Sequence, residues 1–554
     1  MLRFLHKILP CQNLFLFKTG VCLKKGMEFK MKKLGKCLKK YNFITIFLII
    51  IMCGIIVFYQ SKKVGFHEDE VYTLCSSVNP DNGLMAAYDD WEKPPVWRTK
   101  EYVKKFTSLE PKNYLNFKAL YMNQAYDNHP PVFYTFVHFS SIIFGGKFNI
   151  YTVFVVNIIA FIFTCIVLSK ILKLLNKENL IYSVLILYGL CMGTISIVIF
   201  QRMYMLLTFF TILYFYLNLK IYKNDFKLDI KIIIQLGITA VLGFLTQYFF
   251  AIFALFIFVI MLVEGIFKRK DKSFIKKYII SHLIYAVIGV LLFVPCIKHL
   301  LFSDRGLSNL KNASYFKHML IYIKHLAYMF SIKEYYLLVL AGLVVFFIIL
   351  INKNKEEEQI FLTKIFTIPS LMFFLITVKL TSFQELRYIA QIIPFIVLYL
   401  FLILDRLVKT KYKNIIFISI SVFLVVHGFV ISSPKFLYRN YQDYLEIAKE
   451  NSEKSFIYVY DNIFNHIQSI PEMMIYNKTL IINKNKDELK YVIKDKELNK
   501  ANSYILCIKS YLNNEEILSE ITKNSEFKNV KVLIKNNCEN YDDKIENNLY
   551  LISK

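Results

Sequence analysis

The sequence predicts a polytopic α-helical membrane protein of about eleven transmembrane helices, with a large first outer loop and a small C-terminal α/β domain. Of its 554 residues, 56% are hydrophobic and 16% aromatic, and the mean hydropathy is +0.43, values typical of membrane proteins. Apolar runs of roughly 20 residues, enough to cross a hydrocarbon core of about 30 Å, recur along the chain. Lysines gather in every second short loop between these runs, which is the positive-inside pattern.

The formal net charge of +27 could indicate a nucleic-acid-binding protein. The positions of the lysines argue against that function, because they mark the loops that stay on the inner side of a membrane. We therefore expect membrane lipid, and no nucleic acid, among the partners.

The N-terminal segment, residues 1–40, is basic and is predicted to be cytoplasmic. The apolar run that follows, near 41–60, is too long for a signal-peptide core and lacks a small-residue cleavage site, so we expect a retained anchor. Met27 offers a more economical start, so residues 1–26 are a candidate mis-assigned beginning.

The module between residues 41 and 432 is predicted to cross the membrane eleven times. The strongest inner loop is 268–277, whereas the outer turns near 201–202, 246–247 and 379–387 are poor in lysine. The expected spans lie near 41–60, 150–169, 180–199, 203–220, 231–246, 248–267, 278–297, 335–351, 360–378, 388–404 and 414–432. This threading predicts a multi-pass protein of the plasma membrane.

The first outer loop is predicted to cover residues 61–148. Within it, the apolar stretch 131–145 is too short to span, and counting it as a crossing would place the basic loop 268–277 outside. We expect an interfacial helix that begins at Pro130-Pro131 and ends at Gly145-Gly146.

Residues 433–554 change in character and become rich in Lys, Asn and Glu. Alternating strands and helices predict a small extracytoplasmic α/β domain with a mainly parallel sheet. The expected strands are 456–460, 479–482, 504–508, 530–534 and 549–551, and the expected helices are 486–493 and 514–523. The domain has no glycine-rich phosphate loop, so no chemistry is assigned to it.

The predicted threading brings five polar or aromatic clusters to the outer membrane face. They are Asp69-Glu70, His129 before two prolines, Arg202 with Tyr204, Gln247-Tyr248, and Arg387-Tyr388. Each has an ordinary structural explanation: loop acids are solvated, arginines near helix ends extend to lipid headgroups, and tyrosines form an aromatic belt.

Arg202 is the least ordinary of these residues, because it stands between two apolar runs with almost no loop. A cation at such a position is costly unless an anion accompanies it. A lipid phosphate would suit the planar donor fork of arginine. A nearby carboxylate could then act as general base on an acceptor hydroxyl.

These motifs resemble those of bacterial GT-C glycosyltransferases, in the branch that includes protein O-mannosyltransferases and the aminoarabinose transferase acting on lipid A. The resemblance covers residues 41–432. It rests on Asp69-Glu70-Val71-Tyr72, on His129-Pro130-Pro131 with Tyr134 and His138, on Arg202-Met203-Tyr204, and on Arg387-Tyr388 leading to Pro394.

The resemblance implies a GT-C fold, a polyprenyl-phosphate sugar donor and an inverting transfer to an extracytoplasmic acceptor, which could be a glycan, a lipid or a protein. It implies that Asp69 is the general base, supported by Glu70, and that Arg202 and Arg387 bind the donor phosphate. His129, Tyr204, Gln247, Tyr248 and Tyr388 would complete the substrate site. The family often has Thr-His-Tyr where this chain has Thr246-Gln247-Tyr248, so an imidazole role at that position is not expected.

No cofactor is predicted, and the adjacent acids 68–70 do not make a convergent metal site, although a divalent metal stays an alternative. A transporter or flippase for a lipid-linked glycan is the second reading of the sequence. It would require ionisable residues near the midplane and repeated, interrupted helices. Apart from Glu264, close to a helix end, the predicted spans hold few mid-span charges, and the sequence shows no internal repeat. A catalytically inactive scaffold is the third reading, and the acids and arginines together argue against it.

Overall fold

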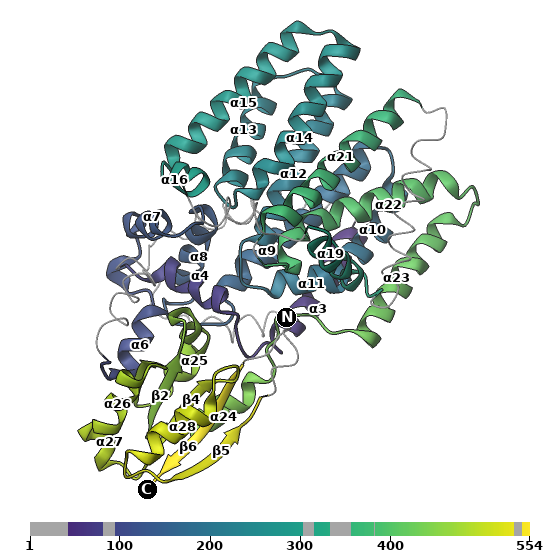
Figure 1. The fold of residues 1–554 in the computed structure, drawn as a ribbon. Helices are drawn as coiled ribbons and strands as arrows, with labels where there is room; N and C mark the ends of the chain where they lie inside the picture. The colour runs from purple at the N-terminus through teal and green to yellow at the C-terminus, as the bar shows by residue number, and fades with distance from the viewer. Residues whose placement is uncertain (1–42, 81–94, 303–314, 333–355, 382, 537–545) are drawn as a thin grey trace, which may run out of the picture. The chain divides into compact units, whose positions relative to one another are not determined.

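The computed structural model describes residues 43–80, 95–302, 315–332, 356–381, 383–536 and 546–554. In these residues the chain is mainly helical and carries one six-stranded sheet (Figure 1). The basic segment 1–40 and the predicted span 335–351 lie outside the described residues.

Eight helical segments are long and apolar enough to cross a membrane in the described part of the chain, and a pair of bent helices makes a ninth. They are α3 (Phe43–Gln60), α9 (Thr152–Leu174), α12 (Tyr204–Lys223), α14 (Phe249–Glu264) with η3 (Gly265–Arg269), α15 (Lys272–Leu292), α21 (Glu357–Leu380), η4 (Leu386–Ile392) with α22 (Ile393–Leu407), and α23 (Lys413–Ile431). A further apolar helix, α13 (Ile230–Phe244), is shorter. The polytopic helical class is confirmed, and the total of eleven spans stays a prediction.

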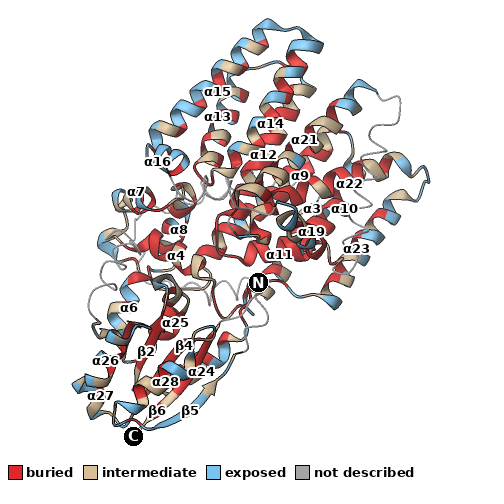
Figure 2. Ribbon diagram, viewed as in Figure 1, coloured by how far each residue is buried: buried red, intermediate tan, exposed pale blue. Residues whose placement is uncertain are grey.

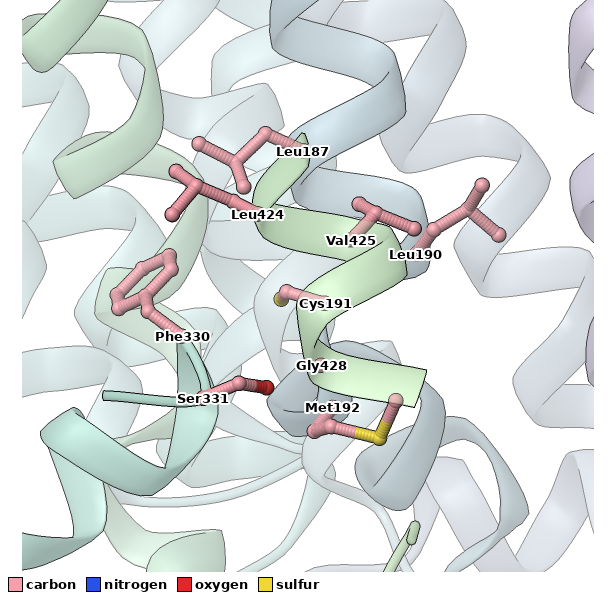
Figure 3. Close-up of a pocket in the computed structure, with 9 residues that line it drawn as sticks. All are labelled: Leu187, Leu190, Cys191, Met192, Phe330, Ser331, Leu424, Val425 and Gly428. Carbon is pink, nitrogen blue, oxygen red and sulfur yellow. The ribbon is translucent and has the colours of Figure 1, made fainter. Parts of the chain in front are cut away.

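The bent pair follows η2 (Glu178–Leu180) and consists of α10 (Ile181–Leu190) and α11 (Met192–Ile199), which meet at 56°. Cys191 between them has extended backbone dihedrals, which interrupts the helical hydrogen bonding. The bend borders a small cavity lined by Leu187, Leu190, Cys191, Met192, Phe330, Ser331, Leu424, Val425 and Gly428 (Figure 3). The space between these mostly apolar side chains is too small for a water molecule, so it is a packing gap and not a ligand site.

Gly428 explains how α23 packs so closely at this bend. A Cβ atom at Gly428 would lie 2.5 Å from the Ser331 Oγ atom, which is closer than such contacts allow. A larger residue would therefore require either that the Ser331 side chain turns or that α23 moves away from it.

The segment between the first two spans folds into short helices, α4 (Glu68–Val78), α6 (Lys100–Phe106), η1 (Pro111–Asn113), α7 (Phe117–Tyr126) and α8 (Val132–Ile143). The helix predicted over 131–145 is confirmed as α8. It begins after Pro131 and ends at Gly145-Gly146, both of which have the positive φ values that favour glycine. Its twelve residues span only about 18 Å, and its place in the membrane interface stays a prediction.

The five strands predicted in the C-terminal region are confirmed as β2 (Ser455–Tyr460), β3 (Lys478–Asn483), β4 (Ser503–Lys509), β5 (Asn529–Ile534) and β6 (Asn547–Ser553). The predicted helices are α26 (Lys486–Lys494) and α28 (Asn514–Lys523). They are accompanied by α24 (Tyr441–Glu450), η5 (Ile463–Ser469), α25 (Ile470–Met473) and α27 (Lys496–Lys500). The strand order is β1-β3-β2-β4-β6-β5.

The expectation of a mainly parallel sheet was wrong. Only the central pairings of β2 with β3 and with β4 are parallel, while β1–β3, β4–β6 and β5–β6 are antiparallel. β5 and β6 follow each other in the chain and pair directly, which antiparallel strands can do without a crossover helix.

The edge strand β1 (Arg98–Thr99) comes from the segment between the first two spans and not from the C-terminal region. It pairs antiparallel with β3, and Arg98 lies opposite Thr479. The Trp97 Nε1–H group donates a hydrogen bond of 3.0 Å to Asp495 beside it. The segment between the first two spans and the C-terminal strands therefore share one sheet.

Burial separates the sheet from the outer helices of the bundle (Figure 2). Strands β2 and β4 are buried almost throughout, whereas α15 and α23 expose apolar side chains such as Leu283, Leu291 and Val430. Apolar helix faces exposed in this way are expected of helices that face lipid.

Candidate functional site

The first turn of α4 presents Asp69 on a fixed backbone. His67 caps the helix, because its Nδ1 atom accepts a hydrogen bond of 3.0 Å from the Asp69 N–H group. The Glu70 Oε2 atom accepts in return from the His67 N–H group at 2.7 Å, which completes a capping box. Acidic residues at a helix N-terminus also compensate the helix dipole. The local sequence thus fixes the position from which the Asp69 side chain projects.

Glu70 points away from solvent and ties several segments together. Its Oε2 atom also accepts from Lys63 Nζ at 3.0 Å, and its Oε1 atom accepts from the Gln201 N–H group at 2.7 Å. Both side chains of the ion pair are fully buried. Lys63 donates further to the carbonyl oxygen of Phe436. Glu70 is therefore engaged in holding α4 against the turn that precedes α12.

Arg387 lies directly beside Asp69. Its Nη1 atom is 3.0 Å from Asp69 Oδ2, and its Nη2 atom is 3.5 Å from Glu385 Oε1. The Arg387 side chain is only 4% exposed, whereas the Asp69 side chain is 34% exposed. The guanidinium also lies over the rings of Phe200 and Tyr388, with distances of 5.3 and 5.2 Å to the ring centroids. The cation is buried and the anion is accessible.

Arg202 approaches α4 from the turn between α11 and α12. Its Nη1 atom donates to Thr73 Oγ1 at 2.6 Å, to the Tyr134 hydroxyl at 3.2 Å and to the backbone oxygen of Asp69 at 3.3 Å. Its Nη2 atom is 3.1 Å from His129 Nε2. None of the four acceptors is a carboxylate, and no carboxylate among the described residues contacts this buried guanidinium.

His129 connects Arg202 to an acid. The His129 Nδ1 atom is 2.9 Å from Asp127 Oδ2, so a ring that carries its proton on Nδ1 donates to Asp127 and accepts from Arg202. Burial opposes ionisation of Asp127, but the charge and hydrogen bond of His129 outweigh it and lower the pKa of the carboxyl. The structure places His129 in contact with Arg202, and its role in substrate binding stays a prediction.

The three neighbours at the start of α4 differ in their electrostatics. Burial opposes ionisation of Asp69, but Arg202 and Arg387 outweigh it and hold the pKa of Asp69 well below its usual range. Burial, reinforced by the charge of Asp69, raises the pKa of Glu68 to about 7. Burial lowers the pKa of His67 to about 4. At neutral pH Asp69 is ionised and His67 is neutral, while Glu68 is close to its midpoint.

Tyr204 and Tyr388 form an aromatic wall beside the arginines. Their rings meet edge to face at 5.8 Å, and Tyr204 stacks on Phe200 at 6.2 Å. Phe249 continues the wall at 6.1 Å from Tyr388. The structure therefore brings both predicted tyrosines to the Asp69 site.

Gln247 and Tyr248 belong to a neighbouring group. The Tyr248 hydroxyl is 2.8 Å from His299 Nδ1 on α16 (Cys296–Leu301), and His299 Nε2 is 3.3 Å from the backbone oxygen of Ala125. Gln247 accepts only from the backbone N–H group of Tyr248 in the described residues, at 2.7 Å. An imidazole thus accompanies Tyr248, although it comes from residue 299 and not from the family's Thr-His-Tyr position.

Four contributors were not predicted from the sequence: Lys63, Thr73, Asp127 and His299. The Asp127-Asn128-His129 spacing was a readable signal, because an acid two residues before a histidine can reach its ring. The other three residues are brought in by tertiary packing. In the described part of the chain no three His, Cys, Asp or Glu side chains converge to hold a metal ion, and a metal requirement stays a matter for experiment.

Known proteins resemble this chain in structure and not in sequence. No protein-family model matches it, and no curated protein matches it. The crystal structure of ArnT from Cupriavidus metallidurans bound to undecaprenyl phosphate is similar with a TM-score of 0.53 at 10% identity, over 92% of this chain and 98% of that chain. The archaeal oligosaccharyltransferase AglB from Archaeoglobus fulgidus, in complex with an inhibitory peptide and a dolichol-phosphate, matches with a TM-score of 0.38 at 10% identity, over 88% and 72%. The likeness to ArnT along nearly the whole chain confirms the predicted GT-C fold.

Proposed function

We propose that this chain is a membrane glycosyltransferase, which transfers a sugar from a polyprenyl-phosphate donor to a cell-envelope acceptor on the outer side of the membrane. The observation that carries the proposal is the buried Arg202 guanidinium, whose four acceptors include no carboxylate. Its Nε atom and the Nε atom of Arg387 lack hydrogen-bond partners among the described residues. Buried cations with spare donors are costly unless an anion completes the site.

A phosphate diester is the anion that suits these donors best. Arginine presents its N–H groups in a rigid fork that matches phosphate oxygens, and two such forks here flank one accessible carboxylate. The fold supports the same ligand class, since the similar ArnT structure is described as bound to undecaprenyl phosphate.

Asp69 is the group we assign as general base. The acceptor hydroxyl oxygen bonds to the anomeric carbon while the bond from that carbon to the phosphate oxygen breaks, which inverts the configuration. The hydroxyl proton passes to Asp69, and the electron pair leaves with the polyprenyl phosphate, whose charge Arg202 and Arg387 stabilise. The donor phosphate also offsets the arginine charges that depress the pKa of Asp69. Donor binding thereby makes Asp69 a stronger base when it is needed.

The other predicted residues have supporting roles in this proposal. Glu70 positions α4 through Lys63 and the Gln201 backbone, and it has no free oxygen for chemistry. His129 orients Arg202. Tyr388, which is only partly buried, offers an aromatic surface to the donor sugar or to the first isoprene units, and the buried Tyr204 packs against its ring. Gln247 and Tyr248 lie further along the substrate site, next to His299.

Glu264, the ionisable residue weighed for the transporter hypothesis, is paired at a helix end. Glu264 lies at the end of α14, where its carboxylate pairs with Lys364 at 3.0 Å and with Lys268 at 3.6 Å. An acid paired in this way at a helix end holds helices together and does not line a midplane pathway.

The proposal is tested with purified protein in nanodiscs, incubated with radiolabelled polyprenyl-phosphate sugars and a cell-envelope extract. Wild-type protein should transfer label to the extract, and the Asp69→Asn variant should not. Asp405→Asn is a matched control, because it makes the same chemical change at another charged cluster. Transfer by Asp69→Asn at the wild-type rate would refute the base assignment. Lipid-linked sugar that crosses sealed vesicles without transfer would favour a flippase instead.

A further inference from the structure

We propose that the C-terminal sheet carries a saccharide-binding groove, which holds the glycan part of the acceptor. The identity of this ligand as the acceptor rests on the proposed function. The groove has a volume of about 430 Å³ and lies between α26, α28 and the loops that follow β3 and β4. That volume is within the range of small-molecule sites, roughly 300–1,000 Å³.

The groove combines an apolar floor with a polar rim. Leu489 and Ile517 from the core of the sheet domain form part of the floor. Asn483, Asn485 and Asn513 lie on the rim. A pyranose has the complementary composition, with apolar C–H faces and a ring of hydroxyl groups that donate and accept hydrogen bonds.

Tyr511 supplies a fixed aromatic surface. Its side chain is 48% exposed, although its hydroxyl donates a hydrogen bond of 2.8 Å to Asp461 and accepts one from Asn465. A tyrosine held at its hydroxyl end keeps its ring in place and loses little entropy when a ligand stacks on it. The arrangement is pre-organised for a flat, weakly polar partner.

A phosphate or another anion does not fit this groove. The N-termini of α26 and α28 are already capped, because Asn485 Oδ1 accepts from the Glu488 N–H group at 2.9 Å and Asn513 Oδ1 accepts from the Glu516 N–H group at 3.2 Å. Glu516 and Glu520 line the groove, against Lys484 alone among the lining cations. The local charge therefore favours a neutral, hydroxyl-rich ligand.

The position of the groove links it to Asp69. It lies at the carboxyl ends of parallel strands, where β2 is flanked by the later strands β3 and β4, and such a reversal of strand order is where ligands bind in open α/β sheets. The segment after β2 contacts the start of α4, since Gln468 Nε2 donates to the Phe66 backbone oxygen at 3.3 Å. The loops at this edge of the sheet are thus joined directly to the start of α4, and we infer that a glycan of several units extends from the groove toward α4.

The test measures binding without catalysis. Full-length protein in nanodiscs is applied to an array of neutral bacterial oligosaccharides, built from hexoses, 6-deoxyhexoses and N-acetylhexosamines. We expect Tyr511→Ala and the groove-filling Glu520→Arg each to weaken binding at least tenfold. Tyr511→Phe, which keeps the ring, should retain most of it. Tyr491→Ala is the matched control, because Tyr491 is similarly exposed on α26 but does not line the groove.

The outcomes separate this inference from the proposed function. Asp69→Asn should bind the array like wild-type protein, because it alters only the transfer step. Absence of binding to every oligosaccharide, or binding unaffected by both Tyr511→Ala and Glu520→Arg, overturns the inference even where sugar transfer is intact. Competition by inorganic phosphate at millimolar concentration would overturn the assignment of a neutral ligand.

Discussion

Two charged clusters lie near opposite ends of the span Leu386–Leu407. Arg387 is the second residue of this span and contacts Asp69, and Asp405 is close to its other end. Eighteen residues separate the two positions, which corresponds to roughly 27 Å along a helix. We call them the Asp69 cluster (Asp69, Arg202 and Arg387) and the Asp405 cluster (Asp405, Lys177 and Lys413).

The clusters arrange their charges in opposite ways. In the Asp405 cluster the anion is buried and half-exposed lysines pair with it, Lys177 at 2.7 Å and Lys413 at 2.6 Å. Asn179 also donates to the carboxylate, at 3.3 Å. In the Asp69 cluster the cations are buried, their donors are incompletely used, and the anion is accessible.

The two arrangements distinguish a structural charge cluster from a ligand site. A buried anion with solvated lysines is complete as it stands, since water and the two cations satisfy it. Buried arginines with spare N–H groups are completed only by something that is not part of the chain. Each prediction below changes one cluster and uses the other as its reference.

The largest expected effect is on transfer in the Asp69→Asn variant. Loss of the general base should lower the turnover number by about 10²–10⁴, while Asp405→Asn should keep at least half of the wild-type rate. Initial rates of label transfer from a saturating donor measure both. Similar losses in the two variants would mean that the clusters do not differ in function.

The next effect is on donor affinity. Arg202→Ala removes the fork that has no carboxylate among its acceptors, and we expect polyprenyl phosphate to bind about 10–100-fold more weakly, in line with 1.4 kcal/mol for each factor of ten. Lys413→Ala removes a cation from the Asp405 cluster and should leave the dissociation constant unchanged. Titration of each variant in nanodiscs, followed by native mass spectrometry, measures the affinity. An equal weakening by Lys413→Ala would indicate a general effect of positive charge.

Much of the fold could be predicted from the sequence, because its strongest signals are local. Apolar runs of membrane length, the prolines and glycines that bound α8, and the alternating strands all depend on near neighbours in the chain. The strand directions could not be predicted in the same way. The antiparallel pairing of β5 with β6 depends on which strands meet in the folded sheet, and the local sequence pattern does not contain that information. Strand β1 has only two residues, which is too short to show the alternation of apolar and polar residues that predicts a strand.

The candidate site shows the same division. Asp69, Arg202 and Arg387 could be predicted because charges at the ends of apolar runs are conspicuous, and the structure brings these three together. Lys63 and His299 could not, since a lysine after a first span and a histidine in a basic stretch look ordinary until packing buries them. Which polar residues lose their access to water is a tertiary property.

A smaller effect concerns pH. Because the pKa of Glu68 is raised to about 7, its carboxyl gains a proton as the pH falls through about 7, whereas Asp69, with its lowered pKa, stays ionised. The diester phosphate of the donor keeps one negative charge throughout this range. Protonation of Glu68 therefore removes a repulsion, and donor affinity should rise about threefold between pH 8 and pH 6.

The Glu68→Gln variant tests whether Glu68 is the group that causes this pH dependence of donor affinity. Its donor affinity should be independent of pH over the same range and equal to the wild-type value at pH 6. His67 cannot replace Glu68 as the titrating group, because burial lowers the pKa of His67 to about 4. Unchanged pH dependence in Glu68→Gln would assign the titration to a group outside the first turn of α4.

The smallest effect is expected in the Asp405 cluster, when one of its two lysines is removed. Lys177→Ala leaves Asp405 paired with Lys413, so the free energy of unfolding should fall by only about 0–1 kcal/mol. Removing both lysines leaves a buried carboxylate without a cation and should cost about 3–5 kcal/mol, well beyond the sum of the single changes. Thermal unfolding in nanodiscs measures the three variants. Additive losses would mean that the two lysines act independently. The Asp405 cluster would then not satisfy its own charges as a unit, and this contrast with the Asp69 cluster would be wrong.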